Sequence, residues 1–226
     1  SPAGSFFAIS FKDLNTGWYS VYLFKQNPYR YGEWETYRVK TDNRFTTLTT
    51  AVGSDFVALQ SPKALKPVII QWNALTKAWE EKKNDFDSPT ATQVVLTGGQ
   101  NFFLGAYYND TRQELIVQMY YADENRQWQQ GGRKETSAEI DWEYTKPGNF
   151  WATGGSYAAA TYIKEIKDEI IYYDVFLIRW RQDFTFASTE VFNYQQKTSM
   201  ANPIYFSVLN ATVVGNAQHL ARFNGE

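Results

Sequence analysis

Short apolar runs separated by polar turns recur along the whole chain. Four of these runs are 21–24, 68–72, 115–120 and 175–180. Polar turns follow them, for example at 25–27 and 123–125. Runs of this length that are rich in β-branched and aromatic residues and are bounded by turn residues are typical of β-strands. The pattern therefore predicts an all-β fold.

The runs also recur in a fixed order. A glycine precedes a strand about every 45 to 60 residues, which is a repeat period, and these glycines are Gly4, Gly53, Gly99, Gly155 and Gly215. We expect each to serve a tight crossing between sheets that needs a positive φ. Further along each unit comes a large aromatic residue that we expect to open the third strand and to be buried between neighbouring sheets. These residues are Trp34, Trp79, Trp128 and Phe184. A fourth run closes each unit before the next glycine, at 45–52, 92–97, 150–153 and 205–214.

Four short strands per unit is the period of a β-propeller blade. Over nearly its whole length the chain resembles β-propeller repeats in general. It lacks the Gly-His and Trp-Asp pairs of WD40 repeats and the repeated glycine doublet of kelch repeats, so the resemblance extends to the fold and to no single family. The sequence predicts one propeller domain or propeller fragment over 1–226, with units at 4–52, 53–98, 99–154 and 155–214 and the start of a fifth at 215–226. A β-sandwich is the alternative, because it would also give alternating runs and turn glycines.

The fifth unit bears on the partners of the chain. It holds a single predicted strand, and an unpaired strand exposes backbone groups that proteins normally cover. We therefore expect a partner chain or further sequence to complete the propeller.

Composition narrows the classes of ligand. The chain is 18% aromatic, has a net charge of −2 and contains no cysteine. Without a positive field it is not expected to bind nucleic acid, and without cysteine it has no thiolate chemistry. No apolar run reaches the roughly 18 residues of a membrane-spanning helix, so we expect no membrane insertion. Protein or glycan remains as the expected partner.

Catalytic and metal-binding patterns are weak. Asp13 begins a D-x-N-x-G spacing found in Ca²⁺ loops, but no acidic ligand follows it, so we interpret it as a hairpin turn. Asp55, Asp141 and Glu143 lie near predicted strands, and no ring of acids is repeated as glycoside hydrolysis on a propeller would require. His219 is the sole histidine, which leaves no histidine pair for a metal. We expect no catalytic residue, metal or cofactor.

Loop aromatics are the remaining candidates for binding. Trp18, Tyr29, Arg30 and Tyr31 combine rings with a cation, a pairing that suits sugar or protein contact. They predict a non-catalytic binding or scaffolding module of a secreted or surface protein. A glycan-binding lectin is the alternative and a propeller glycoside hydrolase the second alternative.

Two N-x-[ST] patterns predict N-glycosylation and an extracellular or cell-surface location. They begin at Asn109, in an expected hairpin loop, and at Asn210, inside an expected strand.

Overall fold

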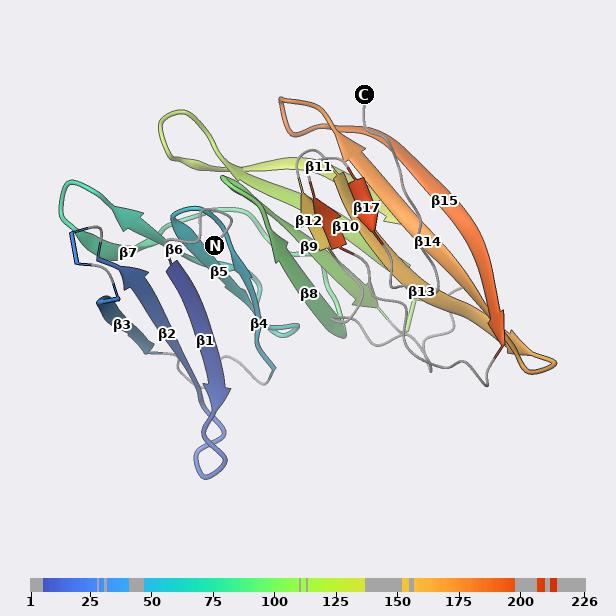
Figure 1. Ribbon diagram of the computed structural model, residues 1–226, viewed down its shortest axis with the longest axis horizontal. Helices are drawn as coiled ribbons and strands as arrows, with labels where there is room; N and C mark the ends of the chain where they lie inside the picture. Colours follow the sequence, from blue (N-terminus) through green and yellow to red (C-terminus); the bar gives the residue numbers. More distant parts are fainter. Residues whose placement is uncertain are drawn as a thin grey trace. The chain divides into compact units, whose positions relative to one another are not determined.

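The computed structural model of this chain consists of β-strands joined by turns (Figure 1). It describes residues 6–27, 29–30, 32–40, 47–109, 111–112, 114–136, 152–154, 157–197, 207–209 and 212–214. Every regular element in these ranges is a strand, so the all-β prediction is confirmed.

The strands form successive sheets in chain order. The first sheet contains β1 (Phe6–Lys12), β2 (Tyr19–Gln26) and β3 (Trp34–Lys40). The second contains β4 (Thr49–Val52), β5 (Phe56–Gln60), β6 (Val68–Asn73) and β7 (Ala78–Lys82). The third contains β8 (Gln93–Gly98), β9 (Phe102–Asn109), β10 (Glu114–Ala122) and β11 (Trp128–Thr136). The fourth contains β12 (Ala152–Gly154), β13 (Tyr157–Lys167), β14 (Ile170–Trp180) and β15 (Phe186–Lys197). A two-stranded sheet of β16 (Ser207–Leu209) and β17 (Thr212–Val214) follows.

Within each sheet, strands that are consecutive in the chain are neighbours in space. The second, third and fourth sheets have four strands each, and the first has three in the described part of the chain. A four-stranded meander repeated along the chain is the topology of propeller blades. The fold class is thus a β-propeller of successive blades, as the period predicts.

The structure corrects the place of the fourth run in the first three units. β4 pairs with β5 in antiparallel register, with Val52 opposite Val57. β12 likewise pairs with β13, with Gly154 opposite Tyr157. The run before Gly53 is therefore the first strand of the next sheet, and Gly53 belongs to a hairpin inside one sheet. Gly99 likewise lies between β8 and β9, which are neighbours in the third sheet. The expectation of a crossing between sheets was wrong.

The positive φ that we expected at the anchor glycines is absent from Gly53 and Gly99. The other anchor glycines, Gly4, Gly155 and Gly215, lie outside the described residues. Among the described glycines only Gly17 and Gly32 have positive φ. The N–H of Gly53 donates to the carbonyl of Phe56 at 3.0 Å, and a Cβ on Gly53 would lie 1.9 Å from Cε1 of that ring. Gly99 repeats this arrangement with Phe102, three residues further on. Glycine is required because the ring covers its Cα atom.

Third-strand aromatics occupy equivalent positions in the sheets. Trp34 lies opposite Gln26, and Trp79 lies opposite Trp72. Two residues before each third-strand tryptophan is a residue with left-handed backbone, and these residues are Gly32, Lys77 and Arg126. In the fourth sheet that left-handed residue is Phe184, with φ of 60°. The expected strand opener Phe184 is therefore a turn residue, and Phe186 takes its place.

Contacts divide the chain into two compact units. The first comprises Ser1–Tyr107 and Met119–Gln130, and the second comprises Tyr108–Gln118 and Gly131–Glu226. In the second unit β14 pairs with both β13 and β15, and a register shift lies between Ile163 and Glu165.

The core of the first unit is built between sheet faces. One cluster joins residues of the first and second sheets, namely Phe6, Val21, Leu23, Val57, Leu59, Ile70 and Trp79. In it the rings of Phe6 and Trp79 meet edge to face at 5.0 Å. Phe56 of the second sheet meets Trp128 in the same way at 4.7 Å. The same contact therefore recurs: a phenylalanine that begins one strand packs on the third-strand tryptophan of the following sheet.

A buried pair of tyrosines lies in the same unit. The hydroxyl groups of Tyr107 and Tyr120 are 2.9 Å apart, and both side chains are fully buried. Burial above all, and then the neighbouring Tyr120, raise the pKa of Tyr107 well above the ordinary tyrosine value of 10.0. The fold therefore favours the neutral form of Tyr107.

This pair predicts a loss of stability at alkaline pH. Above about pH 10 the unfolded chain releases the Tyr107 proton while the folded chain keeps it, so the free energy of unfolding falls by about 1.4 kcal/mol per pH unit for this group. Urea unfolding between about pH 9 and about pH 11 measures the slope. Tyr107→Phe should lose this part of the slope, although it costs about 1–3 kcal/mol at neutral pH by removing the hydrogen bond between the two buried hydroxyl groups. Equal slopes for the two proteins would contradict the assignment.

Candidate functional site

The structure separates the residues of the predicted loop site. Trp18 ends the turn between β1 and β2, whereas Tyr29 and Arg30 lie in the turn between β2 and β3. These turns are at opposite ends of β2, whose 8 residues span roughly 25 Å. Trp18 and Tyr29 are exposed, and Arg30 pairs with Glu33 at 3.5 Å. Tyr31 lies outside the described residues, and the others do not converge on one site.

Asn109, the first predicted glycosylation site, has a buried side chain. Asn109 is the last residue of β9 rather than a loop residue, and it is only 7% exposed. Its Oδ1 atom accepts the backbone N–H of Arg112 at 3.1 Å. The expected position of Asn109 in a hairpin loop was therefore wrong, and modification stays a prediction. Asn210 lies outside the described residues.

The turn at Asp13 uses its carboxylate internally. Oδ1 of Asp13 accepts the backbone N–H groups of Asn15 at 2.8 Å and Thr16 at 3.1 Å. The hydrogen bond from Thr16, followed by that from Asn15, lowers the pKa of Asp13 below its usual value. The interpretation as a hairpin turn is confirmed.

Asp55, one of the acids considered for hydrolysis, forms an ion pair with Arg126 of the β10–β11 turn. Arg126 also donates to the carbonyl of Trp72 at 2.8 Å. Its guanidinium thus joins the second and third sheets inside the first unit. Asp141, Glu143 and His219 lie outside the described residues. In the part of the chain that the structure describes, no three His, Cys, Asp or Glu residues are grouped to hold a metal ion.

The described residues include no helix that is long and apolar enough to cross a membrane.

One face of the first sheet carries the best candidate site. In the register of this sheet Phe7 lies opposite Phe24 and Ile9 opposite Tyr22. Because side chains alternate along a strand, these residues share a face that is opposite the core residues Phe6, Val21 and Leu23. We call this surface the aromatic face, and its residues are Phe7, Ile9, Phe11, Tyr22, Phe24 and Trp34.

The rings of the aromatic face are ordered by contacts with one another. Phe7 stacks on Phe24 at 4.7 Å and meets Trp34 edge to face at 5.0 Å. Phe11 stacks on Tyr22 at 5.4 Å. The guanidinium of Arg38 lies 5.6 Å from the centre of the Tyr22 ring and adds a cation at the rim. The rings of the aromatic face are therefore held in place by contacts with one another, and the guanidinium of Arg38 adds a positive charge at the edge of the face.

The aromatic face is open where the equivalent faces are covered. Trp34 is 41% exposed, whereas its counterparts Trp79 and Trp128 are 6% and 8% exposed. Phe7, Ile9 and Phe11 are 40%, 47% and 49% exposed. Each covered tryptophan receives a phenylalanine from the preceding sheet, while Trp34 contacts Phe7 of its own sheet and, among the described residues, no ring of another sheet. The predicted burial of Trp34 was therefore wrong, and that of the other two is confirmed.

The sequence of β1 contains a pattern that indicates this face, although the aromatic residues of the loops are more conspicuous. Apolar residues occupy both alternating sets of β1: Phe6 and Ala8 on one side, and Phe7, Ile9 and Phe11 on the other. A strand that is apolar on both sides is typical of a sheet covered on both faces. The register of β1 with β2 and β3 shows which side chains share a face, and their exposure shows that one of these faces is open.

Comparisons with known proteins identify no family for this chain. No family model matches the chain, and no curated protein matches it. Among solved structures, the WD40 domain of SCAP from fission yeast is similar, with 11% sequence identity and a TM-score of 0.45. The match covers 96% of this chain and 58% of that one. The assignment of blades therefore rests on the sheet order and on the recurring contacts between sheets.

Proposed function

We propose that this chain is a non-catalytic protein-binding module, and that its aromatic face binds a β-sheet of a protein partner. The observation that carries the proposal is the exposure of Trp34 at a position where Trp79 and Trp128 are buried by a neighbouring sheet. Contiguous exposed apolar surface on a folded domain marks an interaction site. Aromatic residues with an arginine at the rim are also enriched at protein interfaces.

The two covered faces indicate what the partner should look like. Phe6 meets Trp79, and Phe56 meets Trp128, edge to face and from an adjacent sheet. A partner sheet should accordingly bring a ring of its own to Trp34. An acidic side chain near Arg38 would complete the rim, because that guanidinium is exposed.

Site-specific photo-crosslinking tests the proposal. A benzophenone amino acid is placed at Phe11, an exposed residue of the aromatic face, and the full chain is irradiated in extract of its source cells. The control variant carries the same group at Leu75, an exposed position in the β6–β7 turn. We expect a discrete protein adduct from Phe11 and none from Leu75. Equal adducts from both positions, or adducts with glycans alone, would overturn the proposal.

A further inference from the structure

A second surface, unrelated to the aromatic face, is a hollow beside the second sheet. Its volume is about 680 Å³, within the usual range of ligand sites. The walls are the connection between β5 and β6 at Lys63–Val68 and the end of β7 with the residues after it, at Glu81–Asp85. We call it the lysine hollow, after the lysines in its lining: Lys63, Lys66, Lys82 and Lys83.

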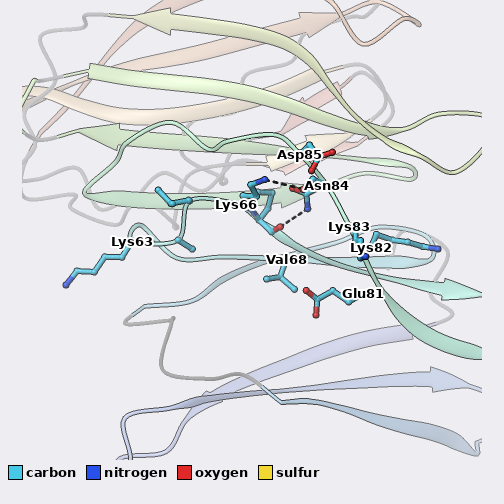
Figure 2. Close-up of a pocket in the computed structure, with 11 residues that line it drawn as sticks. Lys63, Lys66, Val68, Glu81, Lys82, Lys83, Asn84 and Asp85 are labelled. Atoms are coloured by element: carbon cyan, nitrogen blue, oxygen red, sulfur yellow. Dashed lines mark hydrogen bonds between the residues drawn. The ribbon is translucent and has the colours of Figure 1, made fainter.

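Hydrogen bonds hold the two walls together. Nδ2 of Asn84 donates to the carbonyl of Pro67 at 3.0 Å, and Nζ of Lys66 donates to the carbonyl of Asn84 at 3.5 Å. Figure 2 shows these bonds bridging the walls. The hollow is therefore a formed feature of the fold rather than a gap between independent loops.

The lining of the lysine hollow carries a net positive charge. Four lysines face two carboxylates, Glu81 and Asp85, in a chain whose net charge is −2. Lys82 pairs with Glu80 at 3.6 Å. Among the described residues none of the other three lysines has a carboxylate within ion-pair distance. The hollow is thus a local positive site on an acidic chain.

The positions of the lysines favour an elongated ligand. Lys63 lies on one side of the hollow, and Lys82 and Lys83 lie on the other (Figure 2). The lining also contains apolar residues, namely Ala64, Leu65, Pro67 and Val68, and Leu65 is largely exposed. A small inorganic anion would reach one side and leave the apolar surface unused. An extended peptide with acidic and apolar side chains would use both.

We propose that the lysine hollow binds an acidic segment of a protein in extended conformation, with carboxylates toward the lysines and an apolar side chain over Leu65 and Val68. This site does not depend on the aromatic face. The two surfaces would let the module hold a partner sheet and an acidic tail separately.

Binding of a designed peptide tests the inference. The probe is a fluorescein-labelled peptide of alternating glutamate and leucine, and its counterpart has glutamine in place of glutamate. The chain is titrated into each, and the affinity is measured by fluorescence anisotropy. The double variant Lys63→Gln with Lys83→Gln should bind the acidic peptide about tenfold more weakly, because two exposed charge contacts are lost. The matched control, Lys12→Gln with Lys167→Gln, changes net charge equally at exposed positions outside the hollow and should bind like the unmodified chain.

The possible outcomes are distinct. Tight binding of the glutamine peptide, equal weakening in both double variants, or no binding at all would overturn the inference. Displacement of the peptide by inorganic phosphate as readily as by unlabelled peptide would show a simple anion site and would overturn it as well. Phe7→Ser, on the aromatic face, should leave peptide affinity unchanged, so failure here is distinguishable from failure of the proposed function.

Discussion

Replacing Trp79 by alanine is expected to lower the free energy of unfolding by about 3–5 kcal/mol, the range for removing a buried tryptophan. Its ring fills the space between the first two sheets against Phe6 and Trp72, at 5.0 and 5.6 Å. Trp34 holds the equivalent register position, yet in the isolated chain its loss should cost only about 1–2 kcal/mol, because much of its apolar area is already in water. Urea unfolding of the two variants measures the difference.

Leu75→Ala, in an exposed turn, controls for the replacement of a large apolar side chain by alanine. It should change the free energy of unfolding by less than about 0.5 kcal/mol. An equal cost for Trp34→Ala and Trp79→Ala in the isolated chain would show that the aromatic face is already covered. It would remove the surface on which the proposed function depends.

Substitutions at Gly53 and Phe56 should show the largest coupling in the free energy of unfolding. Gly53→Ala places a methyl group against a fully buried ring, at a cost of about 1–3 kcal/mol. Phe56→Ala alone costs about 3–5 kcal/mol. In the background of Phe56→Ala the ring is gone, so Gly53→Ala should cost less than about 1 kcal/mol, and the double variant should be more stable than the two single losses predict.

Gly17→Ala provides the matched control for this cycle. Gly17 has φ of 72°, and no atom lies within 4 Å of the position that a Cβ would take there, so its substitution costs stability through backbone strain alone. Its effect should add to that of Phe56→Ala without coupling. Additive behaviour of Gly53→Ala with Phe56→Ala would contradict the steric account of the glycine.

Much of the fold follows from local pattern, and what does not follow depends on pairing. Strand positions and the repeat are readable because apolar runs and turns are local. The run before Gly53 pairs forward, with β5, and nothing in its own residues states whether it pairs backward or forward. Phe184 and Phe186 are both aromatic, so only the hairpin geometry separates the turn residue from the strand residue.

The candidate site was less predictable for the same reason. Trp18 and Tyr29 attract notice as loop aromatics, but the length of β2 keeps them apart. Each residue of the aromatic face is of a type that is usually buried in a protein core. Whether it is exposed depends on whether a neighbouring sheet covers it. Trp34 and Trp79 both lie near the start of the third strand of their sheet, and only Trp79 is covered by a ring of a neighbouring sheet among the described residues.

The measurement that tests the central claim most directly is the identity of the partner residue crosslinked from the aromatic face. Mass spectrometry of the adduct formed by the benzophenone group at Phe11 gives that residue. We predict attachment within a β-strand of a protein partner, with an aromatic residue on the same face of that strand. Attachment to a helix or an unstructured tail, or adducts no more frequent than those from Leu75, would contradict the claim that this face receives another sheet.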